Sequence, residues 1–317
     1  MDLSAAQTGL ARSRQMLRTA LGPLLLARLE DPGVAEVMLN PDGRVWLDRF
    51  DVGLVDAGLR IEAADAERIL RLVAHHVGAE IHAGRPRLSA ELPGSGERFE
   101  GLVPPLVAAP AFAIRKPASL VFTLDDYVRA GVMDARQAQV LAEAVVARRN
   151  ILVVGPTSSG KTTLVNALLA EIAASGDRVV LIEDLPELQC AAANRLALRT
   201  AEGLASLADL VRAALRLRPD RIVIGEVRGG EALDLVKAWG TGHPGGVSTL
   251  HAGSALGGLM RLEQLIQEAV VAAPRGLIAE TLDLIAVLLG RGQQRRLVEL
   301  VRLEGLSPGG DYRLSPA

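Results

Sequence analysis

The sequence predicts an α/β protein with an open parallel sheet in its C-terminal half and a smaller α+β domain before it. Residues 151–174 pass from an apolar strand through a glycine-bounded loop into a helix. Three more apolar strands follow, and each leads into charged or histidine residues. The N-terminal half instead combines short strand patterns and turn residues with amphipathic helices, which is typical of an α+β unit.

The loop after the first strand has the spacing of a phosphate-binding loop. Gly155 and Gly160 frame four residues and are followed by Lys161 and Thr162. In this pattern backbone N–H groups surround a phosphate, the lysine reaches the β and γ phosphates of ATP, and the hydroxyl binds Mg²⁺. The helix that begins there points its positive dipole end at the anion. The predicted nucleotide-binding residues are Gly155, Pro156, Thr157, Ser158, Ser159, Gly160, Lys161, Thr162 and Thr163.

Composition bounds the organisation of the chain. The 317 residues, 49% hydrophobic and 23% charged, are enough for two domains with cores of their own, which we place at 1–133 and 134–317. A net charge of −2 does not indicate a nucleic-acid partner, although a local basic groove is compatible with it. The single cysteine, Cys190, excludes an intrachain disulfide and a cysteine zinc site and fits a reducing cytoplasm.

No apolar run approaches the roughly 18 residues that span a bilayer. Three arginines before Leu24 loosely suggest a signal peptide, but Pro23 and Arg28 favour an amphipathic first helix instead. Both domain packing and peripheral membrane contact suit such a helix.

Two alternating runs within residues 34–49, joined by an Asn-Pro-Asp-Gly turn, predict a β-hairpin. A helix is expected over 64–77, with Gly78 as its stop. Between residues 87 and 117, short apolar segments separated by prolines and glycines predict edge strands of a small mixed sheet. Arg98 and Arg115 lie in these strands beside apolar residues, and both an ordinary ion pair and a ligand-binding role fit them.

Residues 118–133 are expected to bridge the two domains. Asp134 followed by Gln137 resembles a capping box that opens a helix to about Arg149. After residue 255 we expect two helices and a terminal hairpin, 284–290 with 296–303, in which nothing suggests chemistry.

Polar residues follow each of the other strands of the predicted parallel sheet. Glu183 follows the strand 178–182, Glu226 and Arg228 follow 221–224, and His251 follows 246–250. Ligands bind outside the carboxyl ends of parallel strands, so all four strand ends should meet at one nucleotide. Hydrolysis needs a polarised water, Mg²⁺ and neutralised phosphate charge. We therefore expect Glu183 to activate water, Glu226 and Thr162 to hold Mg²⁺, and His251 to contact the γ phosphate, whereas His243 stabilises a turn.

Four segments in this order resemble the Walker A, Asp box, Walker B and His box of the secretion and traffic ATPase superfamily. They are residues 155–163, 182–189, 218–229 and 241–252. The His-Pro-Gly-Gly form, the N-terminal hairpin and the segment 114–117 look most like the conjugative-transfer ATPases of type IV secretion, the TrbB type. Walker B ends in a glutamate instead of an aspartate, and Leu185 occupies a position that is often polar in relatives.

This resemblance implies a homohexameric ring with a RecA-like C-terminal domain and an N-terminal domain that covers the nucleotide. It implies work with type IV secretion proteins at the cytoplasmic face of the inner membrane. It also implies that N-terminal arginines reach the phosphates, which assigns Arg98 and Arg115 to the site, and that Glu183, Arg228 and His251 carry the motif roles.

Three alternatives stay open. A Flp-type pilus ATPase shares the motifs, whereas one cysteine excludes the four-cysteine zinc element of type II secretion ATPases. A nucleic-acid-stimulated motor is disfavoured by the acidic balance and the 3% aromatic content. A small-molecule kinase would require an arginine-rich lid, which the sequence lacks.

Overall fold

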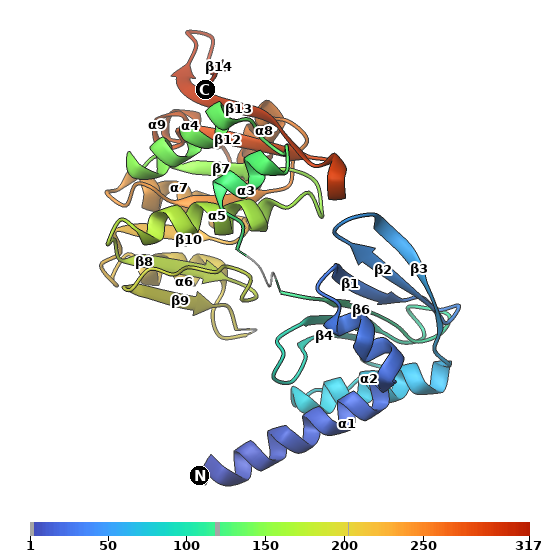
Figure 1. Ribbon diagram of the computed structural model, residues 1–317. Helices are drawn as coiled ribbons and strands as arrows, with labels where there is room; N and C mark the ends of the chain where they lie inside the picture. The colour runs from blue at the N-terminus through green and yellow to red at the C-terminus, as the bar shows by residue number, and fades with distance from the viewer. Residues whose placement is uncertain (1–2, 118–120, 202) are drawn as a thin grey trace. The chain divides into compact units, whose positions relative to one another are not determined.

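The chain forms two units, Met1–Ser119 and Leu120–Ala317, in a computed structural model that describes every residue except 1–2, 118–120 and 202 (Figure 1). No core cluster of the described residues combines side chains from both units. Among those residues, no helix has the length and apolar character needed to cross a bilayer. Each unit is therefore described by itself.

The first unit is a six-stranded sheet with two helices. Its elements are α1 (Leu3–Glu30), β1 (Val34–Leu39), β2 (Arg44–Arg49), β3 (Gly53–Arg60), α2 (Ala63–His76), β4 (Arg87–Glu91), β5 (Arg98–Leu102) and β6 (Ala111–Arg115). The strand order is β3-β2-β1-β6-β5-β4. Helix α1 bends where Gly22 has a φ of 72°, just before Pro23. Leucines of α1 and the buried stripe of α2 pack with the strands into one core, as the amphipathic pattern predicts.

The prediction of a mixed sheet with β5 and β6 at its edge was wrong. Every strand pair in this sheet is antiparallel. β6 pairs with β1 and β5, so both β5 and β6 are interior strands. The prolines that suggested edges, Pro104, Pro105 and Pro110, lie in the loop between β5 and β6. They therefore remove no hydrogen bond from the ladder.

The second unit has an eight-stranded sheet in the order β14-β13-β12-β7-β11-β10-β8-β9. Its strands are β7 (Ile151–Val154), β8 (Val179–Glu183), β9 (Arg195–Arg199), β10 (Arg221–Ile224), β11 (Val247–Leu250), β12 (Leu284–Leu289), β13 (Arg296–Leu306) and β14 (Tyr312–Pro316). Its helices are α3 (Leu124–Arg129), α4 (Ala135–Val146), α5 (Lys161–Ala173), α6 (Leu207–Ala214), α7 (Glu231–Gly240), α8 (Ala255–Gln267), α9 (Arg275–Thr281) and the 3₁₀ turn η1 (Gly292–Gln294). In the order of the sheet, all strands from β12 through β7 to β9 are parallel to one another, and β13 and β14 extend the sheet as antiparallel strands.

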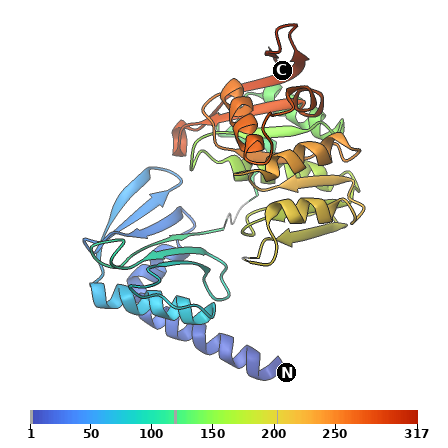
Figure 2. The same ribbon diagram turned by 180° about the vertical axis from the view of Figure 1, so that it is seen from behind.

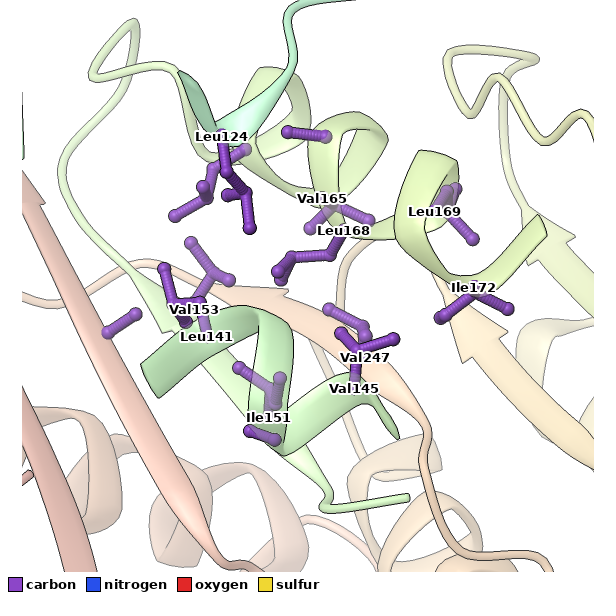
Figure 3. Packing of buried hydrophobic residues seen from close by; sticks show 14 of the residues in the cluster. Leu124, Leu141, Val145, Ile151, Val153, Val165, Leu168, Leu169, Ile172 and Val247 are labelled. Carbon is purple, nitrogen blue, oxygen red and sulfur yellow. The ribbon is translucent and has the colours of Figure 1, made fainter. Parts of the chain in front are cut away.

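Helices cover both faces of this sheet (Figure 2). Successive residues of a strand point to opposite faces. Accordingly Ile151 and Val153 pack with α3, α4 and α5, whereas Leu152 and Val154 pack with α6 to α9. Figure 3 shows Leu124 of α3 beside Val165 and Leu168 of α5 in the first of these two cores. The described part of the expected bridge from Leu124 onward thus packs in the second unit, because its apolar side chains are buried there.

Candidate nucleotide site

The loop between β7 and α5 has the backbone that its glycines predict. Gly160 has a φ of 93° and Ser158 a φ of 63°, both in the left-handed region. A β-carbon at Gly155 would lie 2.4 Å from the carbonyl oxygen of Leu288, so only glycine fits there. Pro156 and Thr157 are exposed at the tip, whereas Ser159 is fully buried. This is the backbone with which the motif places consecutive N–H groups and the start of a helix around a phosphate.

Lys161 is held at the mouth of this loop. Its Nζ donates to the carbonyl oxygens of Gly155, at 3.0 Å, and Pro156, at 3.1 Å. The same Nζ lies 3.2 Å from Nδ1 of His251, at the end of β11. Lys161 is only 7% exposed. The ammonium group of Lys161, which follows β7, and the imidazole of His251, which follows the neighbouring parallel strand β11, thus lie side by side.

A chain of polar contacts continues from His251 across the sheet edge. Nε2 of His251 lies 2.6 Å from Oε1 of Glu226, which follows β10. The other oxygen of Glu226 accepts hydrogen bonds from Arg228, at 2.9 Å from Nε and 2.6 Å from Nη2. Nη1 of Arg228 lies 3.6 Å from Asp184, which follows β8. The strand ends of β7, β11, β10 and β8 therefore meet in one network of charged groups.

Glu183 lies beside this network and is buried. Its Oε1 accepts N–H groups of Glu187, at 2.8 Å, and Leu188, at 2.7 Å. A β-carbon at Gly225 would lie 3.5 Å from its Cγ, which places Glu183 against the end of β10. Burial raises the pKa of Glu183 above its usual value, and the two N–H groups oppose that rise. A carboxylate with a raised pKa is better suited to accept a proton from water than an exposed one.

Arg98 and Arg115 belong to the first unit and lie directly opposite each other on β5 and β6. Glu36 of β1 lies opposite Arg115 on its other side. Within the described chain, neither arginine forms an ion pair within 4 Å, so the ordinary ion pair considered from the sequence is not what holds them. Burial raises the pKa of Glu36, and the two arginines only partly oppose the rise. Two like charges in register are unfavourable by themselves, which fits a surface that receives an anion.

The residues around the loop fit Mg²⁺ that arrives with nucleotide phosphates. No cluster of three or more histidine, cysteine or acidic side chains suited to a metal occurs in the described parts of the chain. Mg²⁺ needs no such cage, because it keeps water ligands and binds one or two protein oxygens together with substrate phosphates. Thr162, at the first turn of α5, and Glu226 are the oxygen donors predicted for it. When bound, the ion would neutralise charge on the phosphates.

The structure thus brings together Lys161, His251, Glu226 and Arg228, with Glu183 beside them. His243 contacts the carbonyl oxygen of Ala238 at 3.3 Å, at the turn after α7, away from this network. Sequence reasoning missed the contact of Asp184 with Arg228, although Asp184 follows directly after Glu183. It also missed Thr249, whose hydroxyl donates to the carbonyl of Gly225 at 2.8 Å and joins the ends of β11 and β10.

The comparisons decide the family. Residues 85–295 match the family described as "Type II/IV secretion system protein". The chain belongs to this family of secretion proteins. This match spans the last three strands of the first unit and most of the second unit.

Relatives and solved structures agree with this family. Conjugal transfer protein TrbB of Rhizobium radiobacter is 48% identical over 291 residues, which cover 91% of this chain and 90% of that protein. The type IV secretion system protein PtlH of Bordetella pertussis is 36% identical, with coverage of 86% and 91%. The ATPase DotB of Legionella pneumophila has a TM-score of 0.61 at 20% identity, covers 88% of this chain and 78% of its own, and supports the fold alone. Family and phosphate loop together make this secretion protein a nucleotide-binding ATPase.

Proposed function

We propose that the chain hydrolyses Mg·ATP as a homohexameric ring and powers conjugative transfer, type IV secretion or the assembly of a related pilus. The observation that carries this proposal is the contact chain from Lys161 through His251 to Glu226, which links the phosphate loop to two other strand ends. The names of the most similar relatives support the transfer role. A position at the cytoplasmic face of the inner membrane and partners in the transfer machinery belong to the same proposal.

Each residue has a role in this mechanism. Lys161 binds the β and γ phosphates. Its ammonium group now donates to two backbone carbonyl oxygens, and the phosphate oxygens would compete with them as acceptors. Glu226 and Thr162 would hold Mg²⁺, which would supply positive charge at the phosphates. Glu183 accepts a proton from the attacking water, and His251 lies between the lysine and Glu226, where it contacts the γ phosphate.

Charge at the developing transition state needs further cations. We assign this role to Arg98 and Arg115, whose paired positions on β5 and β6 suit a phosphate group. Arg228 bonds to Glu226 with two nitrogens and so fixes the carboxylate at the end of β10. A hydrolysis cycle would then bind and release the N-terminal arginines and move the first unit with them.

The decisive experiment measures phosphate release from ATP against protein concentration, with assembly mass followed by light scattering in the same samples. We expect specific activity to rise as a hexamer forms. Lys161→Ala should lower activity by about 100-fold or more, since it removes the cation that stabilises the phosphates. Lys237→Ala, an exposed position on α7, is the matched control and should retain activity. A monomer that hydrolyses ATP equally well would disprove the ring.

A further inference from the structure

The connection between β12 and β13 lies directly against the phosphate loop. β12 pairs in parallel with β7, and Val287 lies opposite Val154, the last residue before the loop. The carbonyl oxygen of Leu288, near the end of β12, lies close to Gly155. At the other end of the loop, a β-carbon on Gly160 would lie 2.8 Å from Nε and 2.9 Å from Cζ of Arg295. The guanidinium of Arg295 therefore packs on the last glycine of the phosphate-binding motif.

This guanidinium has no partner in the described chain. Its Nε is inaccessible to solvent and donates no hydrogen bond to any described residue. No carboxylate of the described residues lies within ion-pair distance of it. An arginine cannot give up its proton, and a buried N–H of a cation without an acceptor is unfavourable. Arg295 as a whole is only half-buried, so an anionic ligand can accept from the terminal nitrogens of its guanidinium.

Tyr127 of α3 lies within range of this charge. Burial raises the pKa of the Tyr127 hydroxyl, and the positive charge of Arg295 opposes the rise. That hydroxyl is also buried without a hydrogen-bond partner among described atoms. The backbone after Arg295 is joined to the segment after α3, because the N–H of Leu297 donates to the carbonyl of Val132 at 2.8 Å. Tyr127 and Arg295 are therefore neighbouring polar groups, and each has a buried polar atom without a partner among the described residues.

We propose, on the basis of the proposed function, that Arg295 binds the phosphates of the nucleotide in the same subunit. The backbone around Gly160 faces the phosphates in this motif, and the planar guanidinium offers paired donors that match phosphate oxygens. Arg295 thereby supplies a second cation beside Lys161, from a hairpin in which the sequence showed no chemistry.

The test measures the affinity of the full chain for ATP and for inorganic pyrophosphate by calorimetry. Arg295→Gln should weaken both about 10- to 100-fold, which is the effect expected when one charged hydrogen bond is lost. Arg295→Lys, which keeps a charge without the fork, should recover part of the affinity. Arg302→Gln, at an exposed arginine on the strand β13 that follows Arg295, is the matched control and should bind as the wild type does.

Unchanged affinity for ATP in both Arg295 variants would overturn the proposal. So would a loss for ATP with unchanged binding of pyrophosphate, because the contact would then be to the base or ribose. The unfolding temperature without nucleotide should stay at the wild-type value in at least the lysine variant; a fall in both variants that accounts for the lost affinity would assign Arg295 to packing. The proposed function fails separately, if the wild-type chain does not bind ATP or if Lys161→Ala binds it equally well.

Discussion

At three positions of the site, the close surroundings restrict which residue can be present and what it can do. Gly155 admits no side chain because the Leu288 carbonyl closes on it, and Gly160 combines a φ of 93° with a close guanidinium. These two positions agree with the role of the glycines in the motif. Glu183 is defined by its surroundings in the same way, since it is buried between two backbone N–H groups and the end of β10.

The raised pKa of Glu183 predicts how stability depends on pH. The folded state binds its proton more tightly than the unfolded state, so Glu183 lowers the free energy of unfolding as pH rises from about 4.5 through its folded pKa. Glu183→Gln keeps an oxygen that can accept the two backbone hydrogen bonds, but it removes the group whose ionisation lowers the free energy of unfolding. The variant should therefore gain stability relative to the wild type across this pH window and keep the gain at pH 7.

Denaturant unfolding of both proteins at several pH values checks this prediction. Glu171→Gln, a solvent-exposed change on α5, should show no such pH-dependent gain. If Glu183→Gln instead became less stable toward pH 7, the two backbone hydrogen bonds would outweigh the burial of the charge. Loss of ATP hydrolysis in the same variant would agree with the proposed role in activating water.

Strand-end residues such as Glu226 and His251 could be predicted because their place depends only on where a buried strand stops. Contacts between loops could not. The ion pair of Asp184 with Arg228 and the approach of Arg295 to Gly160 depend on the paths of separate loops, which no local pattern specifies. The residues at the strand ends could therefore be predicted from the sequence, whereas the loop side chains that contact them could not.

At the scale of elements, periodicity identified the strongly patterned segments. The hairpin of β1 and β2 and the helix α2 were confirmed almost to the residue. Strands β3, β9 and β14 were not foreseen, because none has a buried apolar run. β9, for example, alternates exposed and half-buried residues with arginine at both ends. Such edge strands are determined by the neighbour they pair with more than by their own sequence.

The predicted capping box of α4 is present and gives a test at this scale. Oδ1 of Asp134 accepts the N–H of Gln137 at 2.7 Å, and Oε1 of Gln137 accepts the N–H of Asp134 at 3.0 Å. Asp134→Ala removes the cap and should lower the free energy of unfolding by about 1 kcal/mol. Thermal or urea unfolding measures it. Arg136→Ala, exposed in the same turn, should leave stability unchanged or slightly higher, and an equal loss there would argue against the cap.

At the scale of the whole molecule, the separation of the cores is the main structural fact. The cluster of the first unit draws only on residues up to Ile114, and both clusters of the second unit begin at or after Leu124. The phosphate loop, Glu183, Glu226 and His251 all lie in the second unit, whereas Arg98 and Arg115 lie in the first. Nucleotide binding and full catalysis should therefore be separable.

A fragment of residues 120–317 should fold cooperatively and bind ATP, because it keeps the complete parallel sheet and the phosphate loop. Its rate of hydrolysis should fall by about 100-fold, since the charge contributed by the two N-terminal arginines is lost. Arg98→Gln with Arg115→Gln in the full chain should produce a loss of similar size, while the full chain keeps its unfolding temperature. A fragment that hydrolyses ATP at the full rate would show that the second unit is catalytically complete and would remove both arginines from the mechanism.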